Sequence, residues 1–103
     1  MNRIEKLMEF LKNTPDDSFL KHALSLEYIK VGDDVAAASL FRELLEKDPG
    51  YVGSYYHLGK LLERSGENAE AIVVYEKGME VAKKNNDRHS YSELQAAKEE
   101  LED

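Results

Sequence analysis

Apolar residues along this chain recur at steps of three and four positions, with charged residues between them. This spacing places the apolar side chains on one face of an α-helix, whereas a half-buried β-strand would need strict alternation. The pattern therefore predicts helices throughout the chain and no strand. Because only short polar stretches separate the apolar segments, we expect consecutive helices to pack as antiparallel neighbours.

Proline and glycine mark the ends of several predicted helices. The first helix is expected from about Arg3 to Asn13, because Pro15 disfavours helical geometry at the residue before it. Gly32 and Gly66 are expected to end the second and fourth helices, since glycine readily adopts the left-handed conformation of a helix C-terminus.

Polar residues that can cap a helix mark the predicted starts. Either Asp16 or Asp17 is expected to cap the second helix, because a side-chain oxygen there can accept a free backbone N–H. The later starts are expected at Asp34, at about Val52, at Asn68 and at Ser90, the last with Glu93 three residues on, as in a capping box.

The chain resembles itself after a shift of about 34 residues. The matching pairs are Leu24 with Leu58, Gly32 with Gly66, Asp34 with Asn68, Ala37 with Ala71, and Phe41 with Tyr75. The same shift places the first helix on the third, with Leu7 on Phe41, Phe10 on Leu44, and Pro15 on Pro49. A four-helix bundle has the same short loops but no reason to keep such a period, so the period favours a repeat fold.

The repeated positions resemble the signature of the tetratricopeptide repeat family, W-x2-L-G-x2-Y followed by A-x3-F and P. The second unit has Tyr55, Leu58, Gly59, Leu62, Ala71 and Tyr75 at these positions, and the first has Lys21, Leu24, Ser25, Tyr28, Ala37, Phe41 and Pro49. Lys21 replaces the usual aromatic residue, Ser25 replaces the glycine, and no proline stands at Lys83. The last helix fits only after two extra residues.

The resemblance implies an all-α fold, an α-solenoid of antiparallel helix hairpins wound as a right-handed superhelix. It implies a single domain over residues 1–103, with an N-terminal half-repeat helix at 3–14, repeats at 18–51 and 52–85, and a C-terminal capping helix at 90–102. Gly59 and Ala71 would be the small residues where the two helices of one hairpin approach closely.

The resemblance also implies a protein–protein interaction module of the adaptor type, without enzymatic activity. Such a module binds a peptide segment of another protein in a concave groove, which is lined by the first helix of each hairpin. The residues expected there are Phe19, His22, Leu26, Ile29, Lys30, Tyr56, Lys60, Glu63 and Arg64.

Some members of the family hold a terminal carboxylate with a clamp of Lys, Asn and Arg. Here His22, Leu26 and His57 stand at the matching places. That specialisation is not expected, although Lys30, Lys60 and Arg64 could attract an acidic peptide.

Tyr55 and Tyr56 are adjacent, so in a helix their side chains point about 100° apart and one buried face cannot easily take both. Tyr55 is expected inside the hairpin, which makes Tyr56 a candidate contact residue for a partner. In the alternative, Tyr56 and Phe19 pack between neighbouring helices and bind nothing.

Composition narrows the possible functions further. The chain of 103 residues has a net charge of −7, which would repel nucleic acid phosphates and anionic lipid. It has no cysteine, and no apolar stretch approaches the length of a membrane span. We therefore expect a cytoplasmic protein whose partner is neither nucleic acid nor a membrane.

No residue pattern predicts catalysis, a cofactor or a metal site. The three histidines, His22, His57 and His89, lack a second histidine at metal-binding helical spacing. The main alternative function is a self-associating structural scaffold, a homodimer formed either through Leu7, Met8 and Phe10 at one end of the chain or through Tyr91 and Leu101 at the other.

Overall fold

The structure, a computed structural model, describes residues 1–102 and contains six α-helices and no strand within that range. The helices are α1 (Arg3–Asn13), α2 (Ser18–Lys30), α3 (Asp34–Lys47), α4 (Gly53–Arg64), α5 (Asn68–Lys84) and α6 (Arg88–Glu102). The all-α prediction is confirmed. The limits of the two predicted repeats and the handedness of the superhelix stay predictions.

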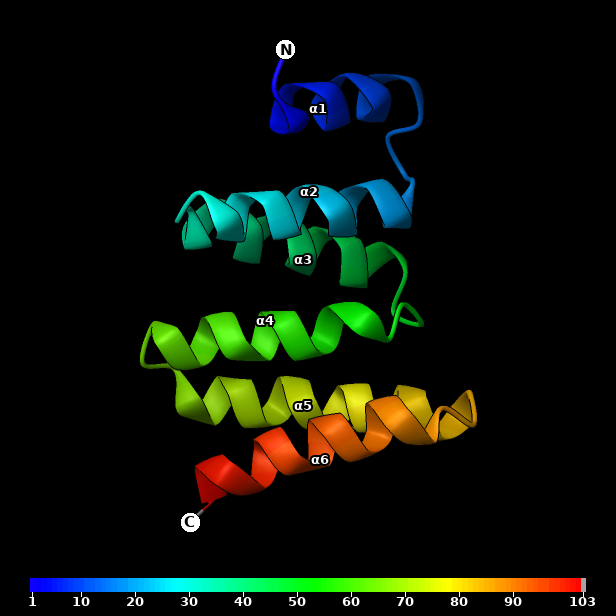
Figure 1. Ribbon diagram of the computed structural model, residues 1–103. Helices are drawn as coiled ribbons and strands as arrows, with labels where there is room; N and C mark the ends of the chain where they lie inside the picture. The colour runs from blue at the N-terminus through cyan, green and yellow to red at the C-terminus, as the bar shows by residue number, and fades with distance from the viewer. Residues whose placement is uncertain (103) are drawn as a thin grey trace. The chain divides into compact units, whose positions relative to one another are not determined.

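The helices form two compact units, and the second unit begins at Pro49. In the first unit, α2 packs against both α1 and α3. In the second unit, α5 packs against both α4 and α6, and α4 also touches α6. Within each unit, every helix runs antiparallel to the one before it (Figure 1).

Three helices end in the same way. Gly32 and Gly66 follow α2 and α4 with φ of +82°, and Asn86 follows α5 with φ of 56°. After each of them, the next backbone N–H donates to a carbonyl of the helix just ended, at 2.9, 2.8 and 2.8 Å. This closure satisfies carbonyls that the helix leaves free. The predicted ends at the two glycines are confirmed, and Asn86 is a third left-handed end that was not predicted.

Asp17 caps α2 by accepting a hydrogen bond from the N–H of Leu20 at 3.0 Å, so one of the two predicted alternatives is confirmed.

The left-handed turns fix where α3, α5 and α6 begin. The prediction of Asp34 as the cap of α3 is wrong, because Asp33 accepts the N–H of Ala36 at 3.1 Å. The turn places the residue directly after the glycine at the cap, so Asp34 is already helical.

The predicted cap of α5 is wrong for the same reason. Glu67 follows the glycine turn and takes the cap position, without a side-chain hydrogen bond to the helix, and Asn68 is the first helical residue.

The predicted start of α6 is also wrong. The capping box of Ser90 and Glu93 does not begin this helix, which starts two residues earlier at Arg88 and so extends the predicted capping helix of residues 90–102. The carboxylate of Asp87 accepts the backbone N–H of Ser90 at 3.0 Å and its hydroxyl at 2.8 Å. Because Asn86 ends α5 in a left-handed turn, Asp87 comes to the cap position.

Close helix packing in the second unit depends on two glycines. A Cβ atom added at Gly59 would lie 2.1 Å from a ring atom of Tyr75, so the predicted close approach of α4 and α5 is confirmed. A Cβ at Gly78 would lie 2.7 Å from the Cβ of Tyr55 and 2.9 Å from a methyl carbon of Leu94. Gly78 therefore lets α4 and α6 both approach α5, a role that was not predicted.

In the first unit, a buried lysine occupies the position of the usual aromatic residue. Lys21 is 3% exposed, and its ammonium group lies 3.6 Å from the Glu43 carboxylate of α3. The hydroxyl of the buried Ser25 donates to the carbonyl of Lys21 at 2.9 Å. The long side chain of Lys21 thus packs in the hairpin while its charge meets Glu43 at the edge.

Candidate functional site

The five predicted groove residues of the first unit lie along one side of α2, because their positions follow the helical period. Phe19 and Lys30 are exposed, whereas His22, Leu26 and Ile29 are half-buried. The rings of His22 and Phe41 pack in a T-shaped arrangement, with their centres 5.5 Å apart. This stripe therefore offers an exposed aromatic ring and a cation at its two ends, with half-buried side chains between them.

The charge of Lys30 is partly offset by a neighbour. Its ammonium group lies 3.2 Å from the carboxylate of Glu27, and the guanidinium of Arg3 from α1 lies 3.4 Å from the same oxygen. Because the Lys30 side chain remains 71% exposed, water screens this pair and leaves the ammonium available to a ligand.

The structure separates the roles of the two adjacent tyrosines in α4. Tyr55 is 2% exposed, and its hydroxyl donates to the carbonyl of Pro49 at 2.5 Å. Tyr56 is half-buried, and its ring lies 6.4 Å from the ring of Tyr75. The ammonium nitrogen of Lys60 lies 5.5 Å from the centre of the Tyr56 ring, within cation–π range. The prediction that Tyr55 packs inside is confirmed, and the contact role of Tyr56 stays a prediction.

Four side chains that contact one another form a group that we call the Tyr56 cluster: Tyr56, Lys60, Glu63 and Tyr75. The carboxylate of Glu63 accepts the hydroxyl of Tyr75 and lies 3.5 Å from the ammonium of Lys60. Burial raises the pKa of Tyr75, and the hydrogen bond to Glu63 raises it further. The Tyr75 hydroxyl therefore stays a donor at neutral pH and holds the Glu63 side chain in place.

Sequence reasoning missed Tyr75 as part of the site, because the repeat pattern marks it as a core residue. Its side chain is indeed fully buried, yet its hydroxyl reaches across the hairpin from α5 to α4. The sequence signal for the Tyr75–Glu63 hydrogen bond is the hydroxyl of Tyr75, at a repeat position where the family pattern has Phe, together with a carboxylate at Glu63 on the other helix of the hairpin. Arg64, the last predicted groove residue, is exposed at the end of α4.

His57 stands at one of the places where the family's carboxylate clamp would lie. It is half-buried, and burial lowers its pKa, while the nearby Glu93 carboxylate acts in the opposite direction. Because burial dominates, the ring is neutral at pH 7 and offers no permanent positive charge to a carboxylate.

The Tyr56 cluster combines side chains of three chemical kinds. They provide an aromatic face, an ammonium donor and a carboxylate acceptor, which suit polar recognition beside an apolar anchor. Across residues 1–102, no group of three or more His, Asp or Glu side chains is placed to hold a metal ion. None of the helices in this described part has both the length and the apolar character that a membrane crossing requires.

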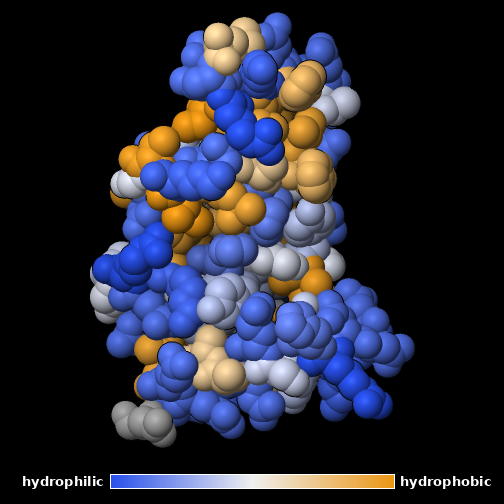
Figure 2. Space-filling view, in the orientation of Figure 1, coloured by the Kyte–Doolittle hydropathy of each residue, from blue (hydrophilic) through white to orange (hydrophobic). Residues whose placement is uncertain are grey.

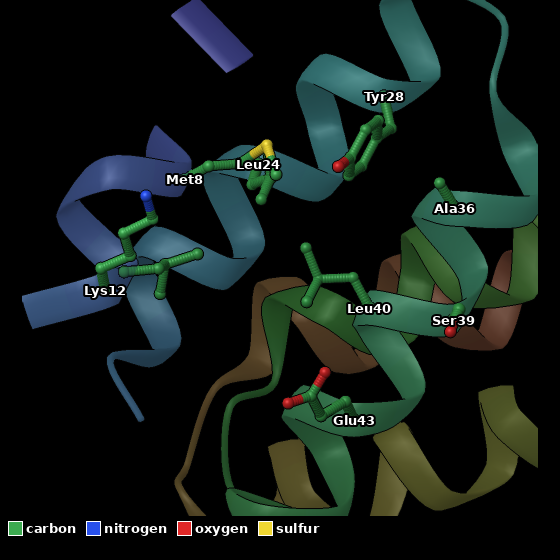
Figure 3. A pocket seen from close by; sticks show the side chains of 9 residues that line it. Met8, Lys12, Leu24, Tyr28, Ala36, Ser39, Leu40 and Glu43 are labelled. Atoms are coloured by element: carbon green, nitrogen blue, oxygen red, sulfur yellow. The ribbon is translucent and has the colours of Figure 1, made fainter. Parts of the chain in front are cut away.

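Sequence reasoning also missed a groove in the first unit, which we call the α1–α3 groove. It has a volume of about 500 Å³ and is lined by side chains from α1, α2 and α3 (Figure 3). Most large apolar residues that are exposed belong to this unit, and Figure 2 shows apolar side chains gathered over it. The sequence signal for this groove is the apolar Met8, because the same repeat position holds the charged residues Arg42 and Glu76 later in the chain.

Comparison with known proteins gives consistent results. The sequence pattern of the tetratricopeptide repeat family matches residues 28–101. A TPR repeat-containing protein of Pseudomonas aeruginosa is 30% identical over 91 residues, which cover 88% of this chain and 87% of that protein.

Two solved structures are similar in both sequence and fold. A crystal structure of a tetratricopeptide repeat domain protein from Salinibacter ruber has 46% identity and a TM-score of 0.81, and the match covers 84% of this chain and 96% of that one. A Bordetella parapertussis protein solved in solution has 29% identity and a TM-score of 0.83, with 98% and 88% of the two chains covered. The family pattern spans most of the chain and agrees with the close helix contact at Gly59, so this protein belongs to the tetratricopeptide repeat family.

Proposed function

We propose that this protein is a non-enzymatic adaptor that binds peptide segments of partner proteins through residues of each unit, the exposed side of α2 in the first unit and the Tyr56 cluster in the second. Tetratricopeptide repeat proteins generally act as protein–protein interaction modules. The observation that carries the proposal is the half-buried Tyr56 ring beneath the Lys60 ammonium, because it combines an apolar anchor with a charge.

The chemistry of these side chains suggests the kind of peptide that binds. Tyr56 and Phe19 supply aromatic surface, while Lys30, Lys60 and Arg64 supply cations for acidic side chains. Glu63 is already bound by Tyr75 and Lys60, so it positions the cluster rather than recognising a basic peptide. A short site of this kind is expected to bind weakly, at micromolar concentrations or above.

The net charge of the chain bears on the class of macromolecule that binds. A net charge of −7 disfavours nucleic acids and anionic membranes, so we propose a protein partner in the cytoplasm.

A pull-down from the native lysate tests the binding site. Wild-type protein should recover at least one partner that the double variant Tyr56→Ala, Arg64→Ala recovers much less well, because the variant lacks an anchor and a cation. Val73→Ala, at a residue 61% exposed on α5, is the matched control and should behave like wild type. Equal recovery of every partner by the wild type and the double variant would contradict the assignment.

The second candidate is a homodimeric scaffold formed through the terminal helices. The observation in its favour is the exposure of Met8 and Phe10 on α1, at 48% and 56%. Light scattering distinguishes the two candidates, because a scaffold should be dimeric at high protein concentration. A monomer under those conditions would exclude the scaffold and leave the adaptor.

A further inference from the structure

The α1–α3 groove has a counterpart in the second unit with different chemistry. The counterpart lies against α5 and α6 and is lined in part by Glu76, Met79, Glu80 and Lys98. There the ammonium of Lys98 lies 3.2 Å from the carboxylate of Glu76 and 3.7 Å from that of Glu102. Ion pairs and charged side chains therefore occupy this depression.

The repeat places other residue types at the equivalent positions of the first unit. Met8 corresponds to Glu76, Leu11 to Met79 and Lys12 to Glu80. Tyr28 corresponds to Lys98 once the two extra residues before the last helix are allowed for. In place of an ion pair between two helices, the first unit has a methionine and a tyrosine. Their side chains point toward the groove, which Leu24 and Leu40 also line (Figure 3).

The lining of the α1–α3 groove is therefore mainly apolar, with Lys12, Ser39 and Glu43 as its polar members apart from Tyr28. Leu24 is 4% exposed and belongs to the core, whereas Met8 is 48% exposed at the rim. Apolar surface arranged as a groove of this volume favours burial of the aliphatic side chains of a ligand.

Two charged residues stand at the groove, and only one of them is paired. Glu43 lies 3.6 Å from the buried ammonium of Lys21. Lys12 lines the opposite wall, and within residues 1–102 it forms no ion pair. A ligand that carries a carboxylate next to its apolar face would complement Lys12, whereas a cation could reach Glu43 only by competing with Lys21.

The lining also distinguishes a helical ligand from an extended one. An extended peptide would leave its backbone N–H and C=O groups against aliphatic side chains, which is unfavourable without hydrogen-bond partners. A helix satisfies its own backbone and presents side chains at three- and four-residue spacing. The length of α1, which has 11 residues, limits the ligand to about three helical turns.

We propose that the α1–α3 groove binds an amphipathic helix of a partner protein, about three turns long, with aliphatic side chains on one face and an acidic residue beside them that pairs with Lys12. The lining of this groove includes none of the residues to which the proposed function is assigned, and the inference does not depend on that function.

The probe is a synthetic, alanine-based helical peptide of about three turns. It carries leucines along one face, a glutamate beside them and a fluorescent label, and a second peptide has lysine in place of the glutamate. Fluorescence anisotropy should show saturable binding of the glutamate peptide to the wild-type protein and weaker binding of the lysine peptide. Chemical shifts should change at Met8, Tyr28 and Leu40.

The double variant Met8→Glu, Tyr28→Lys tests the apolar surface by copying the chemistry of the second unit. Its two new side chains can pair as Glu76 and Lys98 do, so the variant should fold, which circular dichroism checks. Binding of the glutamate peptide should weaken about tenfold or more, because the variant removes the apolar contacts. Val73→Glu is the control for a new carboxylate on the exposed surface outside the groove and should bind like wild type.

The variant Lys12→Glu tests the charge. It should weaken binding of the glutamate peptide and improve binding of the lysine peptide, so that the preference is reversed. Tyr56→Ala should change neither affinity, which separates this site from the proposed function.

Several results would overturn the proposal. They are no binding of either peptide by the wild type, equal binding by the folded double variant, or loss of peptide binding in Tyr56→Ala. Self-association that the double variant abolishes, without any peptide binding, would assign the groove to a second copy of the chain and would equally overturn it.

Discussion

The missing side chain at Gly59 lets the Tyr75 ring lie directly against the backbone of α4. The same ring donates its hydroxyl to Glu63, so one residue joins the packing of the hairpin to the Tyr56 cluster. A change that moves Tyr75 should therefore affect both stability and the proposed binding surface.

Gly59→Ala tests this link. Overpacking a core costs about 1–3 kcal/mol, which exceeds the roughly 1 kcal/mol that alanine gains over glycine within a helix. We expect a net loss of up to about 2 kcal/mol in the free energy of unfolding, measured by urea denaturation. Adding Tyr75→Leu to the variant should recover part of the loss, because it removes the clashing ring. A Gly59→Ala protein as stable as wild type would show that the ring can move freely.

At the scale of the helix, the turn that ends one element decides where the next begins. Asn86 is left-handed, and Asp87 therefore takes the cap of α6. The carboxylate of Asp87 has a lowered pKa, chiefly because it accepts the backbone N–H of Ser90 and then the Ser90 hydroxyl. The charged form of Asp87 is thus the one that holds the start of α6.

Two single variants test which residue caps α6. Asp87→Ala should lower the melting temperature and increase hydrogen exchange at the start of α6, because it removes both hydrogen bonds to Ser90. Ser90→Ala should have a smaller effect, since it keeps the backbone N–H. A larger loss from Ser90→Ala than from Asp87→Ala would restore the capping box that the sequence suggested.

The two kinds of element boundary differ in how well the sequence predicts them. Helix ends at Gly32, Gly66 and before Pro15 depend on the backbone limits of single residues, so they can be predicted locally. Helix starts depend on which of several adjacent polar residues a preceding turn brings to the cap. Asp33 and Asp34 differ by one position and could both cap a helix, so composition alone does not choose between them.

The site shows the same division between local and long-range information. The order of Tyr55 and Tyr56 in the repeat predicts which ring is buried. The Tyr75–Glu63 hydrogen bond and the place of Gly78 between two helices depend on contacts between elements, which no local pattern specifies. The α1–α3 groove was not predicted because its signal is a change of residue type between repeats, whereas a repeat is recognised by the positions that agree.

At the scale of the whole molecule, the lowered pKa values of His57 and Asp87 change the stability of the fold in the same direction as pH falls. Burial lowers the pKa of His57, and hydrogen bonds lower the pKa of Asp87. In both cases the unfolded chain binds a proton at a higher pH than the folded chain does. Stability is therefore present above the unfolded pKa and is lost as pH falls.

Thermal unfolding across pH tests this expectation. The melting temperature should begin to fall below about pH 6.5, the ordinary pKa of histidine, and should fall further near pH 4, where aspartate titrates. His57→Gln should remove the first decline and keep the second. A wild-type melting temperature that stays constant between pH 7 and pH 5 would contradict the assigned burial of His57.

The matched depressions of the two units have a consequence for protein engineering. The substitutions Glu76→Met and Lys98→Tyr would replace the ion pair of the second depression with apolar side chains, without changing the backbone. The proposed helix-binding surface could thus be built in a second unit by substituting two residues. This would make repeat proteins convenient starting points for designing new binding proteins.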